Sequence, residues 1–508
     1  MTSTVSYDLV EEDVLGLRMT VFRDRHRSLR SLLDASLDYG DRDYLVDGAA
    51  AEGGRRISFA DHHAAVGRVA SWLADQGVRK GDRVAILGRN SIEWVVAFWA
   101  TVSLGAIAVG LNAWWARAEV DQALADCEPT LFFEDLGPVA ALLEGDDVPL
   151  PTVDIDEDDP AVILYTSGTT GRAKGATHSH RNVVGLVQAQ QHLIGQRVPP
   201  GVTLPPARIL TSNPIFHVSG LHNGVVAGMG AGSTTVWQPG RYDAAKTLRL
   251  LEKERCTSWS TMPTTLWRAV HHPDAPHIDT TALQHIGGGG AAWSPALQQK
   301  IREVFGEQVT WGIGYGQTEC TALATSASFA DLQEHPDTVG RPVATVEVRV
   351  DGGGEIQVRG PMVMLGYWRD EAATRAVIDD ERWLRTGDLG EIRDGLLFLS
   401  SRRSDLILRG AENVYPQEIE NCLEGHPAVA EAAVVGVPDE ELGQQVCAVV
   451  VPLTGVTVDE ADLAAHVKER LAYFKVPSQW IVRSEPLPRN ASGKVLRAQV
   501  LSTLEESS

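Results

Sequence analysis

Hydrophobic and polar positions follow two different periods in the first part of the chain. The helical period predicts a helix over Phe59–Gln76, which ends at Gly77. After a polar turn at 80–82, a short apolar strand is expected over Val84–Leu87. Helices that alternate with short apolar strands are typical of parallel α/β layers, in which helices cover both faces of a sheet.

An uncharged stretch, Trp94–Leu111, has 18 residues and meets the length threshold for a membrane span. Two glycines, Gly105 and Gly110, interrupt it, and its composition changes partway along. We therefore expect a helix that ends at Leu104, with Gly105 as its cap, and a short buried strand over 106–109.

The alternating pattern recurs near Ile286, where a strand leads into Gly287–Gly290. Ser294 is placed to cap a helix that begins at Pro295. The last hundred residues differ, because their periods predict a compact α+β unit. Its expected elements are helix 416–424, strands near 429–437 and 445–452, helix 459–472 and strand 479–483.

These patterns predict an α/β fold with two domains. A large N-terminal domain of layered α/β subdomains is expected over residues 1–400, and a small α+β C-terminal domain over 401–508. The chain length of 508 residues agrees with two or three domains.

The charge balance limits the partners. There are 67 acidic and 45 basic residues, which give a net charge of −22 and argue against nucleic acid or anionic lipid as the main partner. An anion such as ATP would need locally placed donors. The five cysteines are scattered, and the N-terminus has no basic segment followed by an apolar one, so we expect a cytoplasmic protein. A homodimer is one alternative for its assembly.

The segment 165–175, YTSGTTGRAKG, carries the most specific chemical signal. It follows the apolar run Ala161–Leu164, so it is expected to leave the end of a strand. Glycines let backbone N–H groups turn toward phosphate oxygens, hydroxyl groups add donors, and Lys174 adds charge. It is not a Walker A loop, because two residues separate Gly171 from Lys174 and no Ser or Thr follows the lysine.

Five motifs in order resemble those of the adenylate-forming enzymes, in particular the acyl-CoA synthetase and acid:CoA ligase branch. The loop at 165–175 is the first of them. The resemblance covers nearly the whole chain. The other four motifs are NPIFH at 213–217, YGQTE at 315–319, TGDLG at 386–390 and PRNASGK at 488–494.

The resemblance implies a reaction in which a carboxylate attacks the α-phosphorus of ATP to give acyl-AMP and pyrophosphate, followed by acyl transfer to CoA. Two anions must meet, so the site has to supply positive charge and orientation. Lys494 is the implied bridge between carboxylate and α-phosphate, Glu319 the Mg²⁺ ligand, and Thr166 a phosphate donor. His217 is implied to border the acyl pocket, although a structural histidine is nearly as good an explanation.

The remaining implied contacts are to ATP. Tyr315 would offer a face to adenine, and Asp388 would accept the ribose hydroxyl protons with Arg402 as a nearby donor. Gly289, Gly290 and Ala291 resemble a strand end beside the adenine. The other cofactor-binding candidates are Ser167, Gly168, Thr169, Thr170, Gly171, Lys174, Gly316 and Thr318.

The sequence departs from the family pattern at the segment that begins the small domain. The resemblance implies that the small domain is mobile, and Ser404 stands at its hinge position. Ala411 replaces a glycine that follows Gly410 on the implied CoA path. If the glycine conformation is strained for alanine, the cost is of order 1–2 kcal/mol. Either alanine is tolerated, or the protein makes acyl-AMP well and the thioester poorly, so that a second enzyme completes the transfer.

Two lesser alternatives are adenylation of an acid for a carrier protein and a non-catalytic nucleotide-binding regulator. The chain ends soon after Lys494 without a carrier segment, and the presence of Lys494 and Glu319 argues against a dead enzyme. Small residues at Gly287–Gly290, Gly312 and Gly314 leave room near the implied pocket, which favours a bulky hydrophobic acid.

Overall fold

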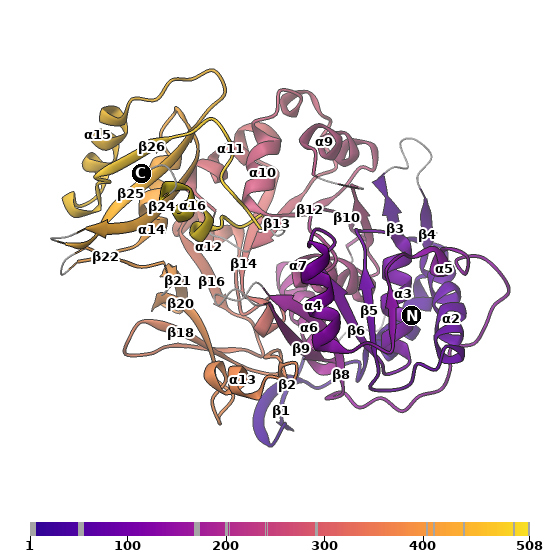
Figure 1. Ribbon diagram of the computed structural model, residues 1–508. Coiled ribbons are helices and arrows are strands. Elements are labelled where there is room, and N and C mark those ends of the chain that lie inside the picture. Colours follow the sequence, from indigo (N-terminus) through magenta and orange to yellow (C-terminus); the bar gives the residue numbers. More distant parts are fainter. Residues whose placement is uncertain are drawn as a thin grey trace.

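The computed structural model shows a chain whose strands form four sheets in the residues that it describes (Figure 1). These are residues 7–48, 55–166, 173–198, 202, 204–238, 240, 242–289, 293–402, 405–409, 412–439, 442–490 and 493–505.

A thirteen-stranded sheet within these residues runs through the centre of the molecule. Its six strands from β3 to β14 are parallel neighbours, and β15 adds to them in the antiparallel direction. In spatial order the strands are β17 (Glu347–Val350), β18 (Glu355–Arg359), β20 (Leu384–Arg393), β21 (Leu396–Arg402), β16 (Thr338–Pro342), β15 (Thr325–Ala327), β14 (Thr310–Tyr315), β13 (His285–Gly289), β12 (Ser258–Thr261), β10 (Arg208–Thr211), β11 (Thr234–Trp237), β3 (Asp43–Asp47) and β4 (Arg56–Ser58).

A second sheet has six strands in the described part of the chain, and four of them are parallel. β8 and β9 form an antiparallel hairpin that carries the ends of the phosphate loop. In order the strands are β19 (Gly366–Tyr367), β9 (Lys174–Ser179), β8 (Pro160–Thr166), β6 (Ile107–Leu111), β5 (Arg83–Leu87) and β7 (Leu131–Phe133).

The predicted helices and strands of the N-terminal part are confirmed. α2 (Phe59–Asp75) begins after Ser58, whose hydroxyl accepts from the backbone of Asp61. α3 (Ile92–Ser103) ends before Gly105, which has a φ of +65° and so stops the helix at low cost. The uncharged stretch is divided between α3 and β6, and no helix among the described residues is long and apolar enough to cross a membrane.

The C-terminal unit has its own sheet and core. β24 (Val429–Asp439) and β25 (Gly443–Pro452) form a long antiparallel hairpin, and β26 (Gln479–Val482) pairs in parallel with β25. α14 (Pro416–Glu424) packs on β24, and α15 (Glu460–Arg470) packs on α14. These elements confirm the predicted pattern, and the sheet is completed by β22 (Ile407–Arg409) and β23 (Glu412–Val414).

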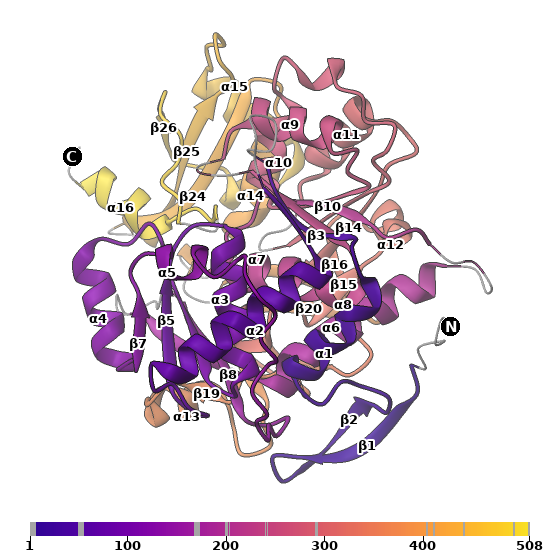
Figure 2. The same ribbon diagram turned by 90° about the vertical axis from the view of Figure 1, so that its right-hand side faces the viewer.

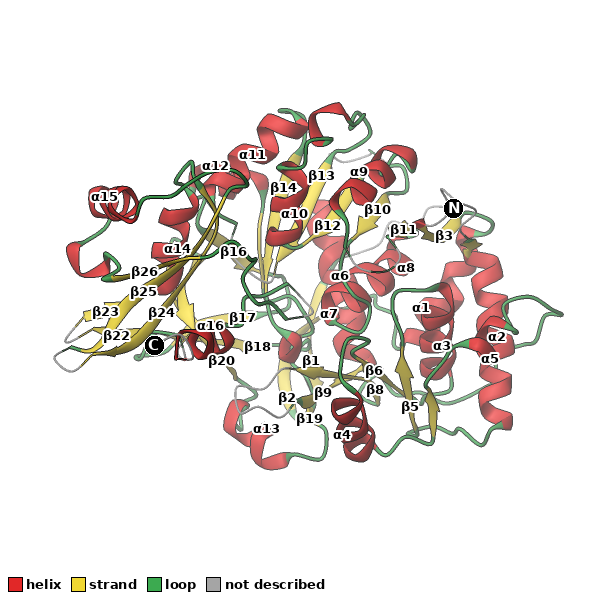
Figure 3. Cartoon of the chain, turned by 45° about the horizontal axis from the view of Figure 1, so that its top comes forward, coloured by secondary structure: helices red, strands yellow, loops and turns green. Residues whose placement is uncertain are grey.

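Helices surround the sheets (Figure 3), and one hydrophobic core takes residues from both large sheets, such as Leu45 of β3 and Val84 of β5. α11 (Pro295–Phe305) begins after Ser294, whose hydroxyl accepts from the backbone of Leu297, as predicted. The hairpin of β1 (Leu9–Val14) and β2 (Leu17–Phe22) lies at the opposite edge from the C-terminal unit (Figure 2). The other helices are α1 (Leu29–Ala35), α4 (Arg117–Cys127), α5 (Gly137–Ala140), α6 (His180–Arg197), α7 (Val218–Gly220), α8 (Ala227–Ala231), α9 (Ala244–Lys253), α10 (Pro263–Val270), α12 (Phe329–Glu334), α13 (Glu371–Val377) and α16 (Arg497–Glu505).

Candidate active site

A large cavity of about 1970 Å³ opens between the two large sheets and the C-terminal unit. Eight arginine or lysine residues and four acidic residues line it in the described part of the chain. This local excess of positive charge supplies the donors that an anionic substrate needs against the negative charge of the whole molecule. Among the implied site residues, the cavity is lined by Thr166, Lys174, His217, Gly289, Gly316, Thr318, Glu319 and Lys494.

The β8–β9 hairpin places Thr166 and Lys174 side by side at the cavity wall. They are direct partners in the strand register, and the Thr166 hydroxyl donates to the Lys174 carbonyl at 3.4 Å. The Lys174 ammonium lies 5.1 Å from the centre of the Tyr367 ring. The other candidate residues of the phosphate loop lie between these two strands and outside the described residues: Ser167, Gly168, Thr169, Thr170 and Gly171.

Glu319 lies on a single 3₁₀ turn, Thr318–Cys320, that follows β14. The Tyr367 hydroxyl donates to Glu319 Oε1 at 2.7 Å and orients the carboxylate. Burial, reinforced by this carboxylate, raises the pKa of Tyr367, so the phenol keeps its proton. His178 donates from Nε2 to the Thr318 carbonyl at 2.7 Å, which fixes the turn from the other side.

The residues at this turn fit a nucleotide-bound Mg²⁺. Glu319 offers a hard oxygen ligand on the cavity wall. The described residues include no group of three or more His, Cys, Asp or Glu that could hold a metal by themselves. Mg²⁺ commonly takes one or two carboxylates and completes its shell with phosphate oxygens and water, so a single carboxylate is sufficient here.

Tyr315 and Asp388 lie behind the cavity wall. The Tyr315 hydroxyl donates to Asp388 Oδ2 at 2.9 Å, and both side chains are buried. Burial, with the Asp388 carboxylate, raises the pKa of Tyr315. Arg402 stands opposite Asp388 in the β20–β21 register. The wall beside them is formed by Thr386 and Gly387, so the implied ribose and adenine contacts remain predictions.

His217 lines the cavity at the start of α7 and packs against Phe216, with 4.9 Å between the ring centres. Burial lowers the pKa of His217 to about 4, so the ring is neutral at pH 7. Its Nε2 has no hydrogen-bond partner within the described structure. The ring can therefore serve as an uncharged wall or an acceptor.

Glycines allow the backbone to come close at the cavity floor. A Cβ atom on Gly289 would lie 2.4 Å from the Gly314 carbonyl oxygen, and one on Gly316 would lie 2.5 Å from that of Ala322. Neither position can hold a larger residue without a backbone shift. Gly290 and Ala291 lie outside the described residues, and so do Ser404, Gly410 and Ala411.

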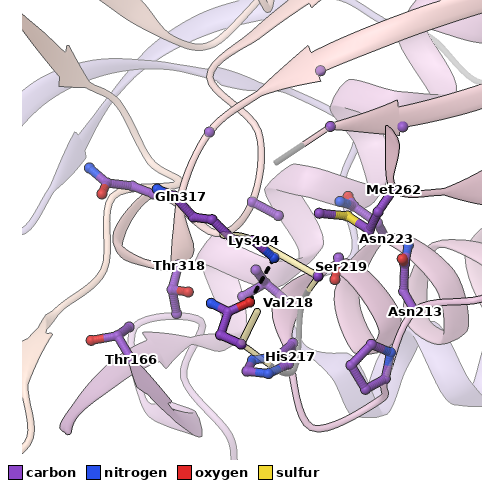
Figure 4. A pocket seen from close by; sticks show the side chains of 18 of the residues that line it. Thr166, Asn213, His217, Val218, Ser219, Asn223, Met262, Gln317, Thr318 and Lys494 are labelled. Carbon is purple, nitrogen blue, oxygen red and sulfur yellow. Dashed lines mark hydrogen bonds between the residues drawn. The ribbon is translucent and has the colours of Figure 1, made fainter. Parts of the chain in front are cut away.

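Lys494 reaches the cavity from the C-terminal unit (Figure 4). Asn490 holds the turn, because its side chain accepts from the Lys494 backbone N–H at 2.9 Å and its own N–H donates to the Lys494 carbonyl at 2.9 Å. Arg489 donates to the Gly493 carbonyl at 2.8 Å and pairs with Glu431 at 2.9 Å. Figure 4 shows Lys494 in one pocket with Thr166, His217, Gln317 and Thr318.

Tyr367, which contacts both Glu319 and Lys174, does not belong to any of the five motifs. Its contact depends on the pairing of β19 with β9, where Tyr367 stands opposite Ala176. No local motif marks it, and the only signal is an aromatic residue in the short segment after Gly366.

Comparison with known proteins agrees with this geometry. The profile of AMP-binding enzymes matches residues 34–368, and that of the AMP-binding enzyme C-terminal domain matches 418–494. An indoleacetate–CoA ligase from Aromatoleum aromaticum is 35% identical over 88% of this chain and 93% of its own length. A 3-[(3aS,4S,7aS)-7a-methyl-1,5-dioxo-octahydro-1H-inden-4-yl]propanoyl:CoA ligase from Rhodococcus jostii is 33% identical over 88% of this chain and 94% of its own.

Among solved structures, that of the anthranilate CoA ligase AuaEII in complex with anthranoyl-AMP has a TM-score of 0.86 and 25% identity. It covers 96% of this chain and 99% of its own. The predicted fold class is thereby confirmed. The chain belongs to the AMP-binding enzymes of the adenylate-forming superfamily, in the branch of the AMP-forming acyl-CoA ligases.

Proposed function

We propose that this enzyme activates a bulky, largely apolar carboxylic acid with ATP and transfers the acyl group to CoA. A carboxylate oxygen attacks the α-phosphorus, and the bond to pyrophosphate breaks. The CoA sulfur then attacks the acyl carbon, loses its proton and displaces AMP. The observation that carries the proposal is the meeting of Lys494, Thr166 and Glu319 in one cavity.

The charged side chains of the cavity divide the work of the first step. Lys494 would reduce the electrostatic repulsion between the carboxylate and the α-phosphate, because both groups are anions. Lys174 and the Thr166 hydroxyl would hold phosphate oxygens from the β8–β9 hairpin. Mg²⁺, held by Glu319 together with phosphate oxygens, would supply further neutralisation of phosphate charge.

The substrate class is supported by the shape of the cavity and by the relatives. The cavity floor is formed by small residues such as Gly287 and Gly312, which leaves space for a large acyl group. The similar enzymes are named for indoleacetate and for a bicyclic propanoate, and both names describe acids with rings.

The efficiency of the second step is a separate part of the proposal. Ser404 and Ala411 depart from the family pattern. Because of them, the alternative remains that the enzyme stops at acyl-AMP and that a second enzyme carries out the transfer. The domain division at 400/401, the mobility of the small domain, a cytoplasmic location and a homodimer also remain predictions.

The experiment that tests the function is incubation with Mg²⁺, ATP and a panel of carboxylic acids, with and without CoA, followed by mass spectrometry. We expect acyl-AMP without CoA and acyl-CoA with it. Acyl-AMP that CoA leaves unchanged would favour the enzyme limited to adenylation. Formation of neither product with any acid would contradict the proposal.

A further inference from the structure

One face of the central strands forms a strip of glycines and small polar side chains, with a single histidine, along the cavity. On β13, His285, Gly287 and Gly289 share this face, because alternate residues of a strand point to the same side. The opposite face carries Ile286, which is buried in the core. Register partners on the same face are Thr310, Gly312 and Gly314 on β14, Ser258 and Ser260 on β12, and Ser326 on β15.

His285 is the largest side chain on this strip. The strip runs from Gly289, at the end where the paired strand β14 leads into the Glu319 turn, to His285 at the start of the strand, a span of about 13 Å at the usual rise of a strand. All members except Thr310 line the cavity. An acid that lies along the strip therefore brings its remote end to His285.

Helix α6 lines the same cavity as this strip. Four of its residues, at 190, 193, 194 and 197, line the cavity, and their spacing places them on one helix face. Leu193 and Ile194 are apolar, while Arg197 lies in the last turn. The middle of the pocket thus suits an apolar acyl body, and one end carries polar groups.

The hydrogen bonds of His285 leave one ring nitrogen as an acceptor. The Thr310 hydroxyl donates to the Gln284 carbonyl at 3.1 Å, so it accepts from His285 Nδ1–H at 3.1 Å. Burial, with the charge of Arg197 nearby, lowers the pKa of His285 to about 4, which keeps the ring neutral at pH 7. The second nitrogen, Nε2, has no partner in the described part of the chain.

Arg197 complements this acceptor. It lines the same cavity, and the described residues give it neither a hydrogen-bond nor an ion-pair partner, although the charge of Asp331 acts on it at longer range. A guanidinium can only donate, and a neutral imidazole with its Nδ1–H already engaged can only accept at Nε2. A hydroxyl group satisfies both, because it accepts and donates. A carboxylate has no proton for Nε2.

We propose that the acid substrate carries a hydroxyl group at the end remote from its carboxylate, which accepts from Arg197 and donates to His285 Nε2. The inference rests on the proposed acid activation and narrows its substrate class. Arg197 and His285 are then specificity residues, and the apolar body of the acid lies between Leu193, Ile194 and the glycine strip.

The test compares pairs of acids that differ only in a terminal hydroxyl. Straight-chain ω-hydroxy acids and para-hydroxylated arylalkanoic acids of several lengths are set against their unsubstituted counterparts, and α,ω-dicarboxylic acids form a third arm. Pyrophosphate release gives kcat/KM for each acid. The variants are Arg197→Met and His285→Phe, with Gln196→Met as a control from the same turn of α6 that does not line the cavity.

We expect the wild-type enzyme to prefer the hydroxylated acid by about tenfold or more at the length that fits the strip. Both variants should lose this preference while they still use the unsubstituted acid, and Gln196→Met should keep it. A preference for the unsubstituted or dicarboxylic acid, or one that survives in both variants, would overturn the inference and leave acid activation standing. Absence of turnover with every acid would instead remove the proposed function and the inference with it.

Discussion

The hydroxyl of Tyr367 donates to Glu319 Oε1 at 2.7 Å, and the same ring lies 5.1 Å from the Lys174 ammonium. One side chain from β19 thus contacts a candidate metal ligand and a candidate phosphate ligand. It holds them on one cavity wall although 145 positions separate them in the chain (319 − 174 = 145).

Tyr367→Phe should lower the kcat/KM for MgATP by about tenfold, because a hydrogen bond to a charged group contributes about 1.5–3 kcal/mol. The loss should shrink at high Mg²⁺, since the metal can then restore the orientation of the carboxylate. Pyrophosphate release as a function of Mg²⁺ measures this. Tyr473→Phe, at a side chain that is 77% exposed, is the control, and equal kinetics for both variants would refute the role of Tyr367.

The candidate site could be predicted from the sequence where its residues belong to one contiguous motif. Thr166, Glu319 and Lys494 each lie in such a motif, since the backbone turn that presents each of them needs neighbouring residues of given type. Motifs do not show how distant turns meet. The structure adds that Lys494, Thr166 and Glu319 line one cavity.

Residues whose roles depend on strand pairing could not be predicted in this way. The position of Tyr367 follows from the β19–β9 register, and that of His285 from a face shared with glycines on β14. Tyr315 shows a third limit. It lies in one of the five motifs, but its hydroxyl donates a hydrogen bond to Asp388, on a strand more than seventy residues later. A buried phenol needs such a partner, and the motif does not show which residue supplies it.

The elements themselves were well predicted where period and caps agreed. Ser294 and Pro295 mark the start of α11, and Gly105 follows the end of α3, because these residue types satisfy or relieve the backbone at helix ends. The strand after Gly105 begins one residue later and ends two later than expected, at Ile107 and Leu111. Buried parallel strands lack an alternating pattern that would mark their ends.

Lys494→Ala should lower the rate of acyl-AMP formation by about 10²–10³-fold, as expected when one preorganised electrostatic contact to a reacting centre is removed. The turn itself should survive, because Asn490 holds it through the backbone of residue 494. Pyrophosphate release measures the rate, and calorimetry should show ATP binding with little change. Lys468→Ala, on α15, serves as the control, and a rate close to wild type for Lys494→Ala would remove the lysine from the mechanism.

Ala411→Gly restores the residue of the family pattern on the implied CoA path. If the methyl group obstructs that path, the variant should form acyl-CoA from preformed acyl-AMP about tenfold faster, with the rate of acyl-AMP formation unchanged. Single-turnover kinetics of the two steps separate these outcomes. Equal rates of acyl transfer in wild type and variant would show that alanine is tolerated, and the enzyme limited to adenylation would lose its support.

Buried neutral histidines should make the fold sensitive to acid. His62 is fully buried, both ring nitrogens lack partners within the described structure, and burial lowers its pKa to about 3. In the unfolded chain the His62 ring binds a proton below about pH 6.5, whereas in the folded chain it stays neutral until about pH 3. The free energy of unfolding therefore falls as the pH falls from about 6.5 toward 3. Each such histidine contributes about 1.4 kcal/mol per pH unit in this window.

His62→Leu should therefore flatten the decline in stability below pH 6.5 by about that slope, whatever its effect at pH 8. Urea unfolding at a series of pH values, followed by tryptophan fluorescence, gives the free energy of unfolding and its dependence on pH. His277→Leu is the matched control, because it removes a histidine that is exposed in the folded protein. If the two variants decline in parallel between pH 6.5 and 4, His62 carries a proton in the folded protein and the burial argument fails.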